Sequence, residues 1–80
     1  MIKKAYFNKP VFIFNTPMES VDIERHPIVK QMETKGPLLY IFTERNDKKE
    51  CIVVPFTNVT SMKVNDELSD SGTLKKTKSK

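Results

Sequence analysis

The residues that could carry catalysis or bind a metal are few in this 80-residue chain. The only histidine, His26, and the only cysteine, Cys51, lie 25 positions apart, and zinc sites do not have that ligand spacing. The only glycines, Gly36 and Gly72, form no glycine-rich phosphate loop, and no serine stands in a Gly-x-Ser-x-Gly elbow. We therefore expect no enzymatic activity, no bound metal and no cofactor.

The remaining ionisable residues have ordinary structural explanations. Asp22 and Glu24 would lie on the same side of a strand, where acid–base chemistry is possible, but such alternation is typical of a solvated face. We expect both carboxylates to point to water. His26 precedes Pro27 and is expected to be a surface or half-buried polar residue, with pH sensing as the alternative role. Cys51 opens the run Cys-Ile-Val-Val and is expected to be a small core residue in a reducing compartment.

The net charge of +4 comes entirely from the C-terminal end of the chain. Residues 1–74 contain ten Lys or Arg and ten Asp or Glu, so the body of the chain is neutral. Four lysines supply the excess, and four charges give only weak, salt-sensitive affinity for phosphate groups. The basic composition by itself therefore does not predict a nucleic-acid-binding domain.

A second basic cluster, made of Lys3, Lys4 and Lys9, lies near the N-terminus. Strand geometry places Lys4 and Tyr6 on the same face, which sets a cation beside an aromatic ring on which a base could stack. The candidate contact residues for a nucleic acid or a protein partner are Lys3, Lys4, Tyr6, Lys9, Lys75, Lys76, Lys78 and Lys80.

The elements that must position these residues read as short β-strands, because apolar, aromatic and β-branched residues recur in short runs. The expected strands are residues 2–7, 11–14, 20–25, 38–43, 50–56 and 59–64. Pro10 is expected to break the chain, and Asn15-Thr16-Pro17 to form a turn. The clearest element is the hairpin of residues 38–56, with Asn46-Asp47 at the centre of its turn. Both of its arms have apolar residues at adjacent positions, so we expect burial on both faces.

The stretch that begins at Pro27 is open to two interpretations. Pro27 fits the first turn of a helix and Gly36 fits its end, and Ile28, Val29 and Met32 would share one helical face. Three apolar residues make a weak helical stripe, however. We therefore favour a strand and keep a short helix as the alternative.

These elements predict a mainly β fold of five to six short antiparallel strands that form a small barrel or a curled sheet. Closure would remove exposed strand edges, which favour aggregation in a small β protein. Residues 1–64 are expected to form this domain. Residues 65–80 contain few apolar side chains and are expected to be a disordered basic tail.

The second half of the domain resembles the small barrels of Sm-like and SH3-like proteins. The resemblance lies in a long hairpin (residues 38–56), a tight corner (Pro55-Phe56-Thr57-Asn58) and a short last strand (residues 59–64). No residues match those with which Sm-like proteins contact nucleotides. The small size and the lysine-rich tail are also similar to small bacteriophage accessory proteins, which implies a phage-encoded protein.

Together these observations predict a non-enzymatic protein-interaction module: an adaptor, an inhibitor of a host protein or an assembly subunit. A thin core favours a protein partner or self-association. The alternative is a nucleic-acid-binding small barrel that uses the N-terminal lysine/aromatic face and the lysine tail. No small-molecule substrate is evident. No apolar run exceeds the five residues of Leu38–Phe42 and no signal-peptide pattern is present, so we expect no membrane contact and a cytoplasmic location.

Overall fold

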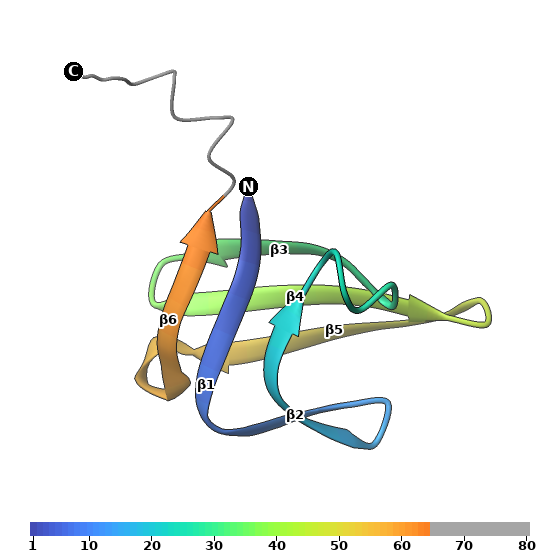
Figure 1. The fold of residues 1–80 in the computed structure, drawn as a ribbon, viewed down its shortest axis with the longest axis horizontal. Helices are drawn as coiled ribbons and strands as arrows, with labels where there is room; N and C mark the ends of the chain where they lie inside the picture. The colour runs from blue at the N-terminus through green and yellow to red at the C-terminus, as the bar shows by residue number, and fades with distance from the viewer. Residues whose placement is uncertain (65–80) are drawn as a thin grey trace.

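The structure of the protein, a computed structural model, describes residues 1–64. Six β-strands and one turn of 3-10 helix make up almost all of this part of the chain (Figure 1). The elements are β1 (Ile2–Ile13), β2 (Thr16–Asp22), β3 (Val29–Lys35), β4 (Leu38–Arg45), β5 (Lys48–Pro55), η1 (Phe56–Asn58) and β6 (Val59–Val64). Across these residues there is no helix long and apolar enough to cross a membrane.

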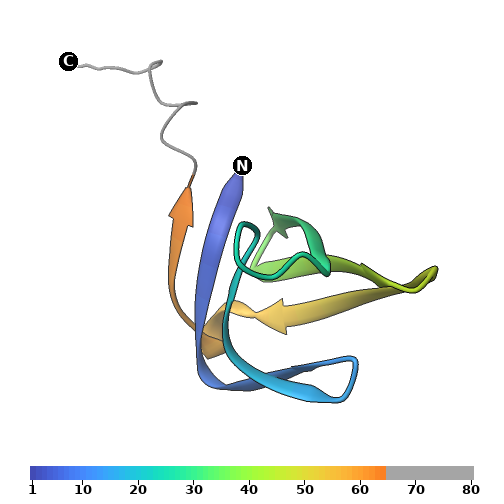
Figure 2. The ribbon, with the colours of Figure 1, turned by 45° about the vertical axis from the view of Figure 1, so that its right-hand side comes forward.

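The strands form two three-stranded antiparallel sheets, in the orders β2-β1-β6 and β3-β4-β5. The strands of one sheet cross those of the other at a steep angle (Figure 1 and Figure 2). The expectation of a mainly β, antiparallel fold is confirmed. Closure into a barrel is not, because within residues 1–64 no backbone pairing joins the two sheets. The predicted tail, residues 65–80, lies outside the described residues.

β1 is longer than expected because Pro10 does not break it. The pairing of β1 with β2 changes register between Tyr6 and Val11, so the residues between these two are not paired with β2. Proline has no backbone N–H, and at this unpaired position Pro10 therefore removes no hydrogen bond between β1 and β2. Asn58 pairs with this segment instead. Its Oδ1 accepts the Lys9 N–H at 2.8 Å, and its Nδ2 donates to the Lys9 carbonyl at 3.0 Å. The corner after β5 is thereby fastened to the middle of β1.

Two hairpins turn through pairs of residues with positive φ, the geometry that matches the twist of paired strands. Asn46 (φ 53°) and Asp47 (φ 66°) turn the β4–β5 hairpin, as expected. The β1–β2 turn falls at Phe14 (φ 47°) and Asn15 (φ 64°), earlier than predicted. A bulky residue rarely adopts this conformation.

Contacts with the β4–β5 hairpin hold Phe14 in place. Its N–H donates to Glu50 Oε1 at 3.2 Å, and the Arg45 guanidinium lies 4.9 Å from the centre of its ring. A cation over an aromatic ring is attracted by the electron-rich face. The tip of one sheet is thus fastened to the other.

The stretch after Pro27 contains strand β3, so the strand interpretation is confirmed. Val29 and Met32 are both buried although they are three residues apart. A register shift between Val29 and Gln31 inserts one extra residue, which turns both side chains to the same side. The helix-like spacing in the sequence is therefore the mark of a β-bulge.

The core lies between the two sheets and is a single layer thick. It takes side chains from β1 and β2 on one side and from β3, β4 and β5 on the other. Its buried apolar residues are Ile2, Ala5, Phe7, Val11, Ile13, Val21, Val29, Met32, Leu39, Ile41 and Val54.

The β4–β5 hairpin is buried on one face only, and the expectation of burial on both faces is wrong. Leu39, Ile41 and Val54 face the core, whereas Val53 is 46% exposed. Cys51 is exposed as well, so it is not a core residue. Two sheets make a two-layer structure, and within residues 1–64 no third layer exists to cover the outer face.

Candidate functional site

Two outer sheet faces carry the candidate functional residues. The first, on the β2-β1-β6 sheet, contains the predicted pair Lys4 and Tyr6. Ala5 is fully buried and lies opposite Val21 and Met62, so its two neighbours in β1 point outward. The structure thus places Lys4 and Tyr6 on one face, as the sequence indicated.

The N-terminal lysines do not form a free basic patch. Lys3 Nζ lies 3.1 Å from Glu24 Oε2, and Lys4 Nζ lies 3.5 Å from Asp22 Oδ2. Lys9 sits in the β1 bulge, where its backbone is held by the corner after β5. The other predicted contacts, the four tail lysines, lie outside the described residues. Basic and acidic side chains are therefore interspersed on this sheet, which is unfavourable for a surface that binds the phosphate backbone of a nucleic acid.

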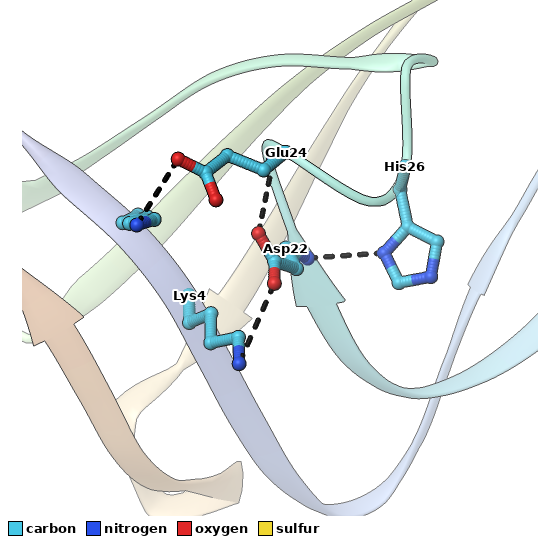
Figure 3. A network of polar contacts seen from close by, with 5 residues as sticks. Lys4, Asp22, Glu24 and His26 are labelled. Carbon is cyan, nitrogen blue, oxygen red and sulfur yellow. Dashed lines mark hydrogen bonds and ion pairs between the residues drawn. The ribbon is translucent and has the colours of Figure 1, made fainter.

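Asp22 does not point to water, contrary to expectation: it is only 5% exposed. Its Oδ1 accepts the Glu24 N–H at 2.9 Å, while Oδ2 faces Lys4 (Figure 3). Burial by itself raises the pKa of Asp22. The Glu24 N–H and the Lys4 ammonium outweigh burial, with help from the Arg25 N–H, and leave this pKa below its ordinary value. Asp22 is thus a buried, ionised anchor at the end of β2.

The same residue organises the turn that follows β2. Its carbonyl accepts the Arg25 N–H at 3.1 Å and the His26 N–H at 2.8 Å. His26 Nδ1 in turn accepts the Asp22 N–H at 3.0 Å, so the neutral ring carries its proton on Nε2 (Figure 3). This turn brings Arg25 and His26 to the same face as Lys4 and Tyr6. His26 is half-buried, as predicted.

These side chains surround an open hollow of about 490 Å³. A second hollow of about 480 Å³ adjoins it, and Tyr6 and Ser20 line both. The first is lined by Lys4, Tyr6, Ser20, Asp22, Arg25 and His26. Sequence reasoning found Lys4 and Tyr6 but missed the rest. The sequence signal that could have predicted the turn was Asp22 at the end of a strand. Aspartate side chains in this position accept a hydrogen bond from the N–H two residues later and so initiate turns.

The second face is the outer face of the β4–β5 hairpin, which we call the apolar face. Alternate residues of β4 point outward and lie directly opposite outward residues of β5. The cross-strand pairs are Leu38 with Pro55, Tyr40 with Val53, and Phe42 with Cys51. The rings of Tyr40 and Phe42 are stacked with centroids 6.4 Å apart, and Lys35 Nζ lies 5.9 Å from the centre of the Tyr40 ring.

Sequence reasoning missed the apolar face because it assigned these residues to the core. The register places charged residues at its margins: Glu33 and Lys35 on β3, and the cross-strand pair Glu44 and Lys49 at the hairpin end. We call these four residues the rim. Two acids and two bases give the rim no net charge.

No protein-family model matches the chain, and searches of curated proteins and of solved structures found no match either. The resemblance to Sm-like and SH3-like barrels, and to phage accessory proteins, therefore stays a prediction. Among residues 1–64, no group of three His, Cys, Asp or Glu is placed to hold a metal ion.

Proposed function

We propose that the protein is a non-enzymatic protein-interaction module, an assembly subunit whose binding surface is the apolar face. The observation that carries the proposal is the uncovered hydrophobic side of the β4–β5 hairpin. The solvent side of an antiparallel sheet normally carries polar residues at alternate positions. Here three consecutive cross-strand pairs are apolar instead. A contiguous exposed apolar patch with a charged margin marks an interaction site.

The composition and rigidity of this face suit it to binding. Tyrosine and phenylalanine are enriched at the centres of protein interfaces, with charged residues kept to the rim. Tyr40 and Phe42 project from the central strand of their sheet and are stacked on each other. Side chains held in place before binding lose less conformational entropy when a partner docks.

The occupant we propose is a second copy of this chain. The rim has two acids and two bases, so two copies do not repel each other by net charge. A two-fold arrangement brings the same patch of each subunit together and allows opposite rim charges to pair. Residues 1–64 contain ten Lys or Arg and seven Asp or Glu, a net charge of +3, so the charge balance that favours self-association is that of the rim and not of the whole domain.

Analytical ultracentrifugation of the full chain tests this proposal. We expect wild type to sediment as a concentration-dependent dimer and Val53→Asp to remain monomeric, because the new carboxylate would be desolvated in the interface. Val64→Asp is the matched control, since Val64 is also exposed (58%) but lies on the other sheet. A wild-type chain that is monomeric up to about 1 mM, or a Val53→Asp variant that dimerises normally, would overturn the proposal.

The alternative is nucleic-acid binding through Lys3, Lys4, Tyr6 and Lys9 together with the lysine tail. The shared face of Lys4 and Tyr6 favours it, while the ion pairs of Lys3 and Lys4 weaken it. Binding by the tail alone would fall with salt at a log–log slope of at most about −4. Fluorescence anisotropy with a single-stranded oligonucleotide, using the full chain and a chain lacking residues 75–80, measures both contributions.

A further inference from the structure

The hollow between β1, β2 and the turn after Asp22 has a chemistry that the protein-interaction proposal does not use. We infer that this hollow is a binding site for a phosphate monoester. It lies on the β2-β1-β6 sheet, whereas the apolar face belongs to the other sheet. Either proposal can therefore fail without affecting the other.

The walls of the hollow offer hydrogen-bond donors whose protons are largely unused. Its one carboxylate, Asp22, has both oxygens engaged, by the Glu24 N–H and by Lys4. Within residues 1–64, the hydroxyls of Tyr6 and Ser20 have no hydrogen-bond partner. A ligand that enters the hollow thus meets no free carboxylate, and it meets two hydroxyls that can donate to it.

The two remaining wall residues strengthen this donor character. The guanidinium of Arg25 has no ion-pair partner in the described part of the chain. His26 uses Nδ1 as an acceptor for the Asp22 N–H, which leaves the Nε2 proton for another acceptor. An arginine fork and an imidazole N–H are well suited to the oxygens of a phosphate group.

The charge around the hollow also favours an anion. Lys4 and Arg25 are balanced by Asp22 alone, which leaves one net positive charge. Lys63 lies directly opposite Lys4 on the neighbouring strand β6, and among residues 1–64 it has no carboxylate partner. Like charges in cross-strand positions repel each other. A bound dianion would relieve that repulsion, and a neutral or cationic ligand would not.

The size of the site indicates a phosphate that is attached to a larger group. The adjoining hollow shares Tyr6 and Ser20 with the first and continues past Phe7 and Glu19 to Thr60 and Ser61 of β6, so its one carboxylate lies on the side of the attached group and not beside Arg25. A phosphate held beside Arg25 would leave the attached group to lie across the Tyr6 ring. A monoester presents three peripheral oxygens, so it can accept protons from several of these donors at once, which a planar carboxylate does less well.

NMR titration of the full-length, isotopically labelled chain tests the site at constant ionic strength. The probes are phenyl phosphate, inorganic phosphate and, to distinguish the source of the group, a phosphoserine peptide. We expect phenyl phosphate to cause saturable shifts at Tyr6, Ser20, Arg25 and His26, and to bind more tightly than inorganic phosphate. Tighter binding of the peptide than of phenyl phosphate would identify a phosphorylated protein as the source, and the reverse order a small molecule.

Arg25→Gln should weaken phenyl phosphate binding by tenfold or more, an effect of about 1.4 kcal/mol. Lys30→Gln is the matched control, because it removes the same charge from an exposed position on the other sheet. Arg25 is itself exposed, and the spectra report directly whether each variant is folded. The inference is overturned if phenyl phosphate causes no saturable shifts at the hollow, or if the two variants lose affinity equally. Binding of a single-stranded oligonucleotide without binding of phenyl phosphate would overturn it too.

Discussion

The outer faces of the two sheets, which both point away from the shared core, differ in their chemistry. Each sheet uses one side for the shared core and turns the other to solvent. On the β2-β1-β6 sheet the outer side around the hollow is polar, with Asp22, Lys4 and His26 joined by hydrogen bonds and an ion pair, while Phe12 and Val64 are exposed elsewhere on the sheet. On the β3-β4-β5 sheet it is aromatic and aliphatic, and its central pair is Tyr40 and Val53. In a two-layer fold the residues needed for folding occupy one side of each sheet, so an apolar outer side points to binding.

The largest difference between a core face and an exposed face is expected when the same charge is placed on each of the two faces of the β4–β5 hairpin. Ile41 on β4 is fully buried, so Ile41→Asp should unfold the domain. An unpaired buried carboxylate costs more than the roughly 5 kcal/mol of stability that a small domain has. Val53→Asp should fold normally, because Val53 faces solvent. Circular dichroism and thermal melts distinguish the two variants, and unfolding of Val53→Asp would show that the apolar face is covered.

A smaller effect is expected from the polar face. Asp22→Asn should lower the melting temperature at neutral pH, because the charge-assisted contact with Lys4 is lost. The folded-state pKa of Asp22 lies below its unfolded value, so its stabilisation is present above the unfolded pKa and is lost as pH falls through the folded one. The difference between wild type and Asp22→Asn should therefore shrink below about pH 4. Melts measured from pH 7 to pH 2 check this, and a difference that is constant with pH would contradict the ion pair.

The contact that fastens one sheet to the other should contribute less still. Arg45→Ala removes the guanidinium from the Phe14 ring and should cost about 1 kcal/mol. For a domain of this size that lowers the melting temperature by about 4–8 °C. Lys48→Ala is the control, because Lys48 lies directly opposite Arg45 at the same hairpin end. Equal losses in both variants would mean that the cation over Phe14 contributes nothing specific.

The smallest effect is expected at Cys51, which serves as a probe of the apolar face. Cys51→Ser should change stability by less than about 0.5 kcal/mol, because the side chain is exposed. In the folded chain the thiol should react readily with a thiol reagent at low protein concentration. At high concentration the proposed dimer should slow that reaction. A rate that does not depend on concentration would argue against burial of this face.

Much of the secondary structure could be predicted from the sequence because it depends on local chemistry. The β4–β5 hairpin follows from two apolar runs around Asn46-Asp47, which tolerate the left-handed conformation that the turn requires. The last strand, β6, also lies where its apolar residues predicted it. Of the candidate sites, strand alternation correctly placed Lys4 and Tyr6 on one face.

Other features escaped prediction because each depends on a residue far away in the chain. Pro10 lies inside β1 since Asn58, 48 positions later, bonds to the neighbouring backbone. Phe14 adopts a positive φ where Arg45 and Glu50 hold it. Likewise, the aspartate at the end of β2 is a local signal for a turn, but only the tertiary structure places that turn beside Lys4 and Tyr6 of β1 and so forms the hollow.

The sequence by itself determined that the chain forms antiparallel strands, where most of them lie and that the charges of residues 1–74 sum to zero. These properties follow from side-chain alternation, turn residues and charge counts, all of which are local or additive. Only the tertiary structure decided which side of each strand is covered. Alternation divides a strand into two faces, but the face that meets the core depends on which other sheet packs there. Both faces of the β4–β5 hairpin are apolar, so the packing of the other sheet decides which face becomes the core and which is left as a surface that can bind a partner.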